Sequence, residues 1–125
     1  MLEGMRDLLP QAQIGHIGMF RNEDTLQPVH YYTKIPKIQK NAWVILVDPM
    51  LATGGSAIEA ISILKKHGAK KIKMISLIAA KKGVAVLRKN HPDVELFIGA
   101  IDPVLNNKGY IVPGLGDCGD RLFGT

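Results

Sequence analysis

One short stretch of the chain constrains the fold more than any other. A continuous apolar run at residues 42–47 is typical of a strand buried on both faces of a parallel sheet. Asp48 and a turn with two adjacent glycines follow at once, and from Ser56 onward apolar residues recur at the spacing of a helix. This helix is expected to stop at Gly68, after basic residues in its last turn. The stretch therefore predicts a strand, a loop and a helix in direct succession.

Strands and helices continue to alternate after this unit. Apolar runs at residues 71–79 and 94–101 indicate two further buried strands, and residues 84–89 indicate a helix that ends before Pro92. Such alternation favours an α/β fold with a parallel sheet, flanking helices and right-handed crossovers.

The two ends of the chain have a different character. A short helix is expected at residues 2–9, and the β-forming stretches at 13–20 and 29–35 indicate a two-stranded arm, because prolines flank the second stretch. Residues 102–125 carry five glycines and two prolines, which predicts ordered loops rather than regular elements.

Composition limits the class of protein. A chain of 125 residues with 46% apolar and 22% charged residues suits a single globular domain over residues 1–125 and excludes a disordered chain. The net charge of +5 favours anionic partners, such as phosphorylated metabolites or nucleic acid. The lysines fall in separate short groups, so we interpret them as a solvated face and expect no nucleic-acid partner. The single Cys118 excludes an internal disulfide, and the absence of long apolar stretches and of a signal-peptide pattern predicts a cytoplasmic protein without a membrane partner.

Residues 48–56 carry the chemistry of the predicted site. Ligands of open parallel sheets bind at the carboxyl ends of the strands, where this loop begins. Free N–H groups at the start of a helix favour a phosphate, and Asp48 is suited to accept hydrogen bonds from sugar hydroxyls. The alternative is an ordinary helix capped by Ser56. The loop is not a P-loop, because no lysine follows its glycines.

A second glycine pattern, Gly-x-Gly-x-x-Gly at residues 114–119, matches a dinucleotide-binding motif. Only six residues follow it, which is too few for the helix and strand that this motif requires. We reject a dinucleotide site there, although its glycines permit close backbone approach to a flat ligand.

Taken together, the two motifs resemble uracil phosphoribosyltransferases. Asp-Pro-Met-Leu-Ala-Thr-Gly-Gly-Ser at residues 48–56 is similar to the family's loop for 5-phosphoribosyl-1-pyrophosphate, and Tyr-Ile-Val-Pro-Gly-Leu-Gly-Asp at residues 110–117 is similar to its uracil-binding segment. The likeness extends through residues 15–18, 25–28 and 119–125. It implies a type I phosphoribosyltransferase fold and transfer of a phosphoribosyl group to N1 of uracil, which yields UMP and pyrophosphate in pyrimidine salvage, with Mg²⁺ carried by the donor.

The resemblance also implies roles for individual residues. Asp48 would hold the ribose hydroxyls, Arg21 the pyrophosphate, and Asp117 would face the donor and its Mg²⁺ through water, so these three form the expected catalytic set. Backbone groups of Ile111, Gly116 and Cys118 would match uracil, together with Asp117. We interpret Cys118 as a small tolerated side chain in place of the family's alanine. The expected donor-binding residues are Asp48, Pro49, Met50, Leu51, Ala52, Thr53, Gly54, Gly55, Ser56 and Asp117.

The resemblance further implies a homodimer through the arm at residues 22–34 and, for some relatives as a class, control by GTP. Family members carry further chain ahead of the part that matches Met1, including a strand expected between residues 13–20 and 42–47. We therefore hypothesise a partial form that is weakly active or inactive unless another chain fills the gap. Two other hypotheses stay open: a non-enzymatic regulator on the same fold that binds pyrimidine nucleotides and RNA, and a phosphoribosyltransferase for another base.

Overall fold

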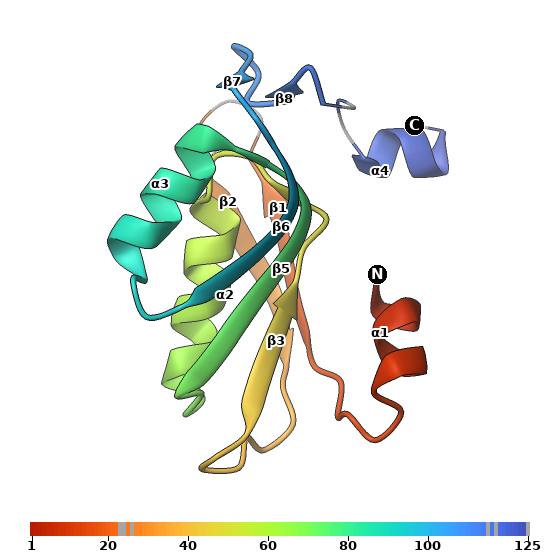
Figure 1. Ribbon diagram of the computed structural model, residues 1–125, viewed down its shortest axis with the longest axis vertical. Coiled ribbons are helices and arrows are strands. Elements are labelled where there is room, and N and C mark those ends of the chain that lie inside the picture. The colour runs from red at the N-terminus through yellow and green to blue at the C-terminus, as the bar shows by residue number, and fades with distance from the viewer. Residues whose placement is uncertain (23–24, 26, 115, 117, 125) are drawn as a thin grey trace.

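The computed structural model describes residues 1–22, 25, 27–114, 116 and 118–124, without the side chains of residues 21, 119 and 120. Its centre is a parallel sheet in which β5 (Lys71–Ala80) is the middle strand. On one side β5 pairs with β3 (Trp43–Val47) and, further along, with the short β4 (Met50–Leu51); on the other it pairs with β6 (Glu95–Asp102). Figure 1 shows these strands running in one direction. The predicted parallel α/β fold is confirmed.

Two helices cover one face of this sheet, α2 (Gly55–Lys66) and α3 (Lys81–Asn90) (Figure 1). As predicted, α2 ends before Gly68, which adopts a left-handed φ of 94°, and Lys65 and Lys66 lie in its last turn, where cations favour the helix dipole. The core lies between the helices and the sheet, and its largest fully buried members there are Leu51, Ile61, Met74 and Leu87. Burial of each such side chain contributes about 2 kcal/mol.

The opposite face of the sheet is largely bare, and here the prediction of strands buried on both faces is wrong. Trp43 on β3 is 54% exposed and Phe97 on β6 is 48% exposed. Lys73 lies between them, with its ammonium group 4.6 Å from the Trp43 ring centre and 5.4 Å from the Phe97 ring centre. An apolar strand is buried on both faces only if something covers both, and among the described residues α2 and α3 pack on one side.

The predicted two-stranded arm is present. β1 (His16–Arg21) pairs antiparallel with β2 (Pro28–Lys34), with an irregularity between Gly18 and Met19. The first strand begins three residues later than the sequence pattern indicated, at 16 instead of 13. Ahead of the arm lies the helix α1 (Leu2–Leu8), which ends one residue earlier than the helix predicted at residues 2–9.

The C-terminal region is more regular than predicted. β7 (Val104–Leu105) and β8 (Ile111–Val112) form a small antiparallel pair, and α4 (Cys118–Phe123) is a short helix. The prediction of loops alone is therefore wrong, because strands of two residues are too short to produce a periodic pattern. Within the described residues, none of the helices is both long and apolar enough to span a membrane.

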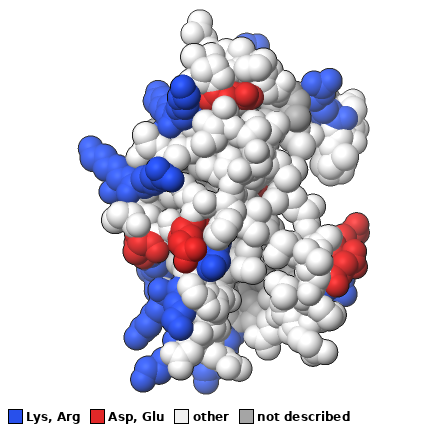
Figure 2. Space-filling view, in the orientation of Figure 1, with Lys and Arg blue, Asp and Glu red and all other residues white. Residues whose placement is uncertain are grey.

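Charged side chains are distributed unevenly over the surface. Lysines and arginines gather over α3 and the neighbouring lower ends of α2 and β5, as Figure 2 shows. Lys65 forms an ion pair with Asp93 at 2.7 Å, and Lys73 forms a longer one with Glu95 at 3.6 Å. Both pairs are solvent-accessible and contribute little, about 0 to 1 kcal/mol each.

Candidate active site

The loop after β3 is fixed to β5 by backbone hydrogen bonds. The N–H of Asp48 donates to the carbonyl of Ile75 at 3.1 Å, and the carbonyl of Pro49 accepts from the N–H groups of Leu77 and Ile78. Met50 and Leu51 then pair with β5 as β4. The start of the loop is therefore a continuation of the sheet, which holds Asp48 at the carboxyl end of the parallel strands.

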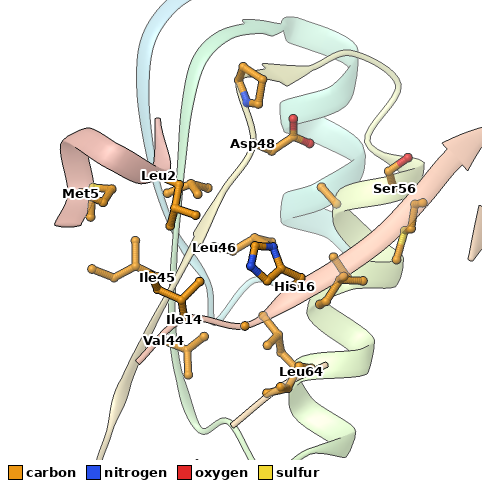
Figure 3. Close-up of a pocket in the computed structure, with 18 of the residues that line it drawn as sticks. Leu2, Met5, Ile14, His16, Val44, Ile45, Leu46, Asp48, Ser56 and Leu64 are labelled. Carbon is orange, nitrogen blue, oxygen red and sulfur yellow. The ribbon is translucent and has the colours of Figure 1, made fainter. Parts of the chain in front are cut away.

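Asp48 is partly buried and lies on the same side of β3 as Leu46, facing α2, whereas Ile45 points to the opposite side (Figure 3). Burial raises the pKa of its carboxyl group, and a hydrogen bond from the N–H of Met50 to Oδ1, at 3.2 Å, partly offsets this by favouring the charged form. A carboxylate held in this way can accept further hydrogen bonds from a polar ligand.

The turn into α2 has the geometry of an anion site. Gly54 is the N-cap, with a left-handed φ of 89° that favours glycine, and no side chain caps the helix. The alternative of an ordinary helix capped by Ser56 is therefore not what the structure has. The first turn of α2 contains no acidic residue, so the helix dipole and the first N–H groups are available to a negatively charged ligand.

Gly83 on α3 packs directly against this loop. A Cβ atom built on Gly83 would lie 2.3 Å from the carbonyl oxygen of Ala52, a distance that real Cβ atoms essentially never show, and at a tight 3.0 Å from that of Leu51. Only glycine therefore allows α3 to approach the loop this closely. Sequence reasoning missed this residue, although a glycine inside a helical pattern is a signal of close packing.

The C-terminal segment is held by a second contact that the sequence did not indicate. The N–H of Gly114 donates to Oδ2 of Asp102, at the end of β6, over 3.0 Å. Gly114 has a φ of 25°, and a Cβ there would lie 2.3 Å from the carbonyl oxygen of Ile111. Ile111 itself is buried. The turn of residues 111–114 is therefore specified by a glycine and a carboxylate from a different strand.

A cavity of about 1220 Å³ joins the two predicted motifs. It is bounded at one end by the loop after β3 and by Ile111, Gly116 and Cys118. The loop residues that line it are Asp48, Pro49, Met50, Leu51, Ala52, Thr53, Gly54 and Ser56. Gly55 is not among them, and the buried Leu51 side chain belongs to the core.

Two predicted catalytic residues lie partly or wholly outside what the structure describes. Asp117 is not among the described residues, and the side chain of Arg21 is not described. The backbone of Arg21 pairs with Pro28 across the arm. A Cβ on Gly55 would lie 3.4 Å from the Pro28 ring, so the base of the arm is next to the turn into α2.

The same cavity extends away from the loop along the free edge of β3. Leu2 and Met5 of α1, Ile14 and several residues of β3 line this part, and Figure 3 shows their side chains around it. Among the described residues no strand pairs with this edge of β3. The cavity thus combines a polar end, at Asp48 and Ser56, with an apolar trough beside an open sheet edge.

These features define a phosphoribosyltransferase fold, with a glycine-containing loop between strand and helix at the carboxyl end of a parallel sheet. The structure superposes on an adenine phosphoribosyltransferase from Trypanosoma brucei with a TM-score of 0.54 at 15% identity, over 89% of this chain and 53% of that one. A purine phosphoribosyltransferase from Pyrococcus horikoshii gives a TM-score of 0.54 at 24% identity, over 88% and 70% of the two chains. At these identities the similarity concerns the fold alone.

The sequence model of the uracil phosphoribosyltransferase family matches residues 1–125, and the chain belongs to that family. Uracil phosphoribosyltransferases from Halalkalibacterium halodurans and Dictyoglomus thermophilum are 56% and 58% identical to it over 125 residues. The AQ2163 protein of Aquifex aeolicus, of known structure, is 43% identical with a TM-score of 0.95. The chain is covered completely in these three matches but spans 60% of the length of each relative.

Proposed function

We propose that this chain provides the donor loop and the uracil segment of a uracil phosphoribosyltransferase, which converts uracil and 5-phosphoribosyl-1-pyrophosphate to UMP and pyrophosphate. The observation that carries the proposal is the cavity that brings Asp48 and the turn into α2 together with Ile111, Gly116 and Cys118. The family membership and the relatives' names support the same reaction.

In this proposal the 5-phosphate of the donor binds the N–H groups of the turn from Ala52 to Ser56, where the uncapped start of α2 favours an anion. Asp48 accepts hydrogen bonds from the ribose hydroxyls. Arg21 binds the pyrophosphate, as a guanidinium fork suits phosphate oxygens, and Asp117 faces the donor through water. The remaining donor contacts come from Pro49, Met50 and Leu51.

Mg²⁺ belongs to the substrate in this scheme. The described residues contain no group of three or more histidine, cysteine or carboxylate side chains placed to hold a metal ion. The ion would enter bound to the pyrophosphate of the donor, as the family resemblance implies, and phosphate oxygens are the kind of ligand that Mg²⁺ prefers.

Uracil binds through the backbone groups of Ile111, Gly116 and Cys118, with the turn fixed by Gly114 and Asp102. Its N1 then forms a bond to C1 of the ribose as the bond from C1 to the pyrophosphate oxygen breaks, the leaving pyrophosphate takes the electron pair, and the proton of N1 passes to solvent water. The transition state resembles a ribosyl cation, so correct positioning and charge stabilisation supply most of the acceleration.

We further propose that full turnover needs polypeptide that covers the open edge of β3. A free strand edge has unpaired backbone groups, and Trp43 on β3 exposes apolar area beside this edge. The chain corresponds to 60% of its relatives' length. The remaining part of such a chain, or another molecule, would form hydrogen bonds with the unpaired backbone groups of this edge. The homodimer through residues 22–34, the cytoplasmic location and control by GTP also remain predictions.

The test is release of pyrophosphate from 5-phosphoribosyl-1-pyrophosphate and Mg²⁺ in the presence of uracil, with hypoxanthine as the competing base. The chain is assayed alone and together with the unmatched two fifths of the Dictyoglomus thermophilum relative, supplied as a separate polypeptide. We expect weak or no turnover alone and uracil-specific turnover in the mixture. Turnover at ordinary enzyme rates by the chain alone would refute the need for covering polypeptide, and a preference for hypoxanthine would refute the assignment of uracil.

A further inference from the structure

The hydroxyl oxygen of Ser76 is buried and has no hydrogen-bond partner. Within the part of the chain that the structure describes, it is the one buried side-chain oxygen or nitrogen atom of which this is true. The residue lies on β5 and is 2% exposed. Buried polar groups in folded proteins are nearly always paired, since an unpaired one loses its bonds to water without replacement. An unpartnered buried hydroxyl therefore calls for an explanation.

The register of the sheet places Ser76 beside Asp48. Leu46 on β3 pairs with Met74 on β5, and both are on the face that packs against the helices. Because side chains alternate along a strand, the residues two positions further on, Asp48 and Ser76, lie on this same face. The bond from the N–H of Asp48 to the carbonyl of Ile75 keeps the two strands together at this point, with neighbouring strands about 4.8 Å apart.

Asp48 has unused capacity to accept a hydrogen bond. Within the described residues, its carboxylate accepts one hydrogen bond, from the N–H of Met50 to Oδ1, whereas an ionised carboxylate offers about four acceptor positions. The Ser76 hydroxyl has no partner in the structure, so a hydrogen bond to the neighbouring carboxylate requires a different rotamer of Ser76 about its Cα–Cβ bond.

We propose that Ser76 is a positioning residue whose hydroxyl donates to the carboxylate of Asp48 and orients its remaining oxygen lone pairs toward the hydroxyls of a bound ribose. This rests on the proposed function, in which Asp48 binds the ribose. Burial raises the pKa of Asp48, and the Met50 N–H is the group that lowers it. A second donor would help to keep the group ionised near neutral pH, as binding of two sugar hydroxyls requires.

The experiment compares Ser76→Ala with the wild-type chain, and uses Ser62→Ala as a matched control. Ser62 lies on α2 and its hydroxyl already donates to the carbonyl of Ile58 at 2.9 Å. Ribose 5-phosphate binding is measured by calorimetry as a function of pH, and the Asp48 carboxyl carbon is titrated by NMR in the free proteins. Ser76→Thr, which retains the hydroxyl, tests for rescue.

For Ser76→Ala we expect about tenfold weaker binding of ribose 5-phosphate, the loss expected for one hydrogen bond to a charged group. We also expect an upward shift of the Asp48 pKa, because the carboxylate loses a hydrogen-bond donor that favours its charged form. Ser62→Ala should change neither binding nor the pKa. A purely structural role of Ser76 would lower the denaturation midpoint and leave the Asp48 titration unchanged.

Two results would overturn the proposal: unchanged ribose 5-phosphate affinity in Ser76→Ala, or identical Asp48 titration curves in Ser76→Ala and the wild type. If the wild-type chain binds no ribose 5-phosphate, the proposed function fails at this loop. The NMR titration of the free proteins then still decides whether Ser76 donates to Asp48.

Discussion

Replacement of Gly83 by alanine should disrupt the proposed phosphate-binding loop at residues 52–56, although alanine is the better helix former. A Cβ at this position would lie 2.3 Å from the carbonyl oxygen of Ala52, so α3 or the loop must move by about 1 Å to restore an ordinary contact. Alanine gains about 1 kcal/mol over glycine inside a helix. Overpacking against a fixed backbone costs about 1 to 3 kcal/mol. With backbone on both sides of the clash the upper end applies, and we expect a net loss of about 2 kcal/mol.

Gly4→Ala is the matched control, because Gly4 also lies inside a helix, α1, and a Cβ there would have no atom within 4 Å. Urea denaturation of both variants measures the free energy of unfolding, and calorimetry measures the affinity for ribose 5-phosphate. For Gly83→Ala we expect the urea midpoint to fall by about 1 M and the affinity to fall at least about tenfold, because the loop is displaced. Gly4→Ala should be as stable as the wild type or slightly more so, with unchanged affinity.

The reasoning would be refuted if Gly83→Ala gained stability like Gly4→Ala and bound ribose 5-phosphate normally. Such a result would mean that the loop does not depend on its contact with α3. If Gly83→Ala lost stability but bound ribose 5-phosphate with wild-type affinity, Gly83 would serve packing alone.

Three further predictions concern other parts of the site and the fold. Asp48→Asn should abolish ribose 5-phosphate binding yet unfold at a higher urea concentration than the wild type at neutral pH. Because the pKa of Asp48 is raised, the folded wild type binds the proton more tightly than the unfolded chain, so its stability falls as pH rises from the ordinary carboxyl pKa through the raised one. Urea denaturation at several pH values should find this loss of stability in the wild type and not in the variant. Gly114→Ala should weaken uracil binding by at least about tenfold, because a Cβ there would lie 2.3 Å from the carbonyl oxygen of Ile111. Calorimetry with ribose 5-phosphate present measures this binding, and normal uracil affinity would argue against the proposed uracil segment. His91→Leu should lower the free energy of unfolding by about 1 to 3 kcal/mol and leave ligand binding unchanged. The buried imidazole links the end of α3 to the Ile58 carbonyl at 3.2 Å and to the Lys65 ammonium group at 3.2 Å. Unchanged stability in urea would contradict this role.

Local sequence patterns were sufficient to predict the part of the fold that carries the loop. The apolar run ahead of Asp48, the turn glycines and the helix that stops at Gly68 are adjacent in the chain, so each signal is present within a single window of sequence. The arm at 16–34 was predictable for the same reason, because prolines and β-forming residues bound it locally.

Other features depend on contacts between distant segments, and no local pattern specifies them. Exposure of Trp43 depends on what covers the second face of the sheet, which the strand's own apolar sequence does not encode. Gly83 and Asp102 act through partners that are 31 and 12 residues away in the chain, at Ala52 and Gly114. Their roles follow only from how the strands and helices meet.

Unfavourable local features are concentrated at one end of the sheet. At the carboxyl end, partial burial of Asp48 raises the pKa of its carboxyl group, Ser76 has an unpaired hydroxyl, and Gly54 adopts a left-handed backbone conformation. Away from this end, the interface of α2 with α3 satisfies its polar groups, since His91 and Lys65 bond to each other and to neighbouring acceptors. Folding alone would favour apolar replacements at Asp48 and Ser76. Their presence beside an uncapped helix start indicates that this end of the sheet is shaped for a ligand, whose hydroxyls and phosphate would be partners for Asp48 and for the first N–H groups of α2.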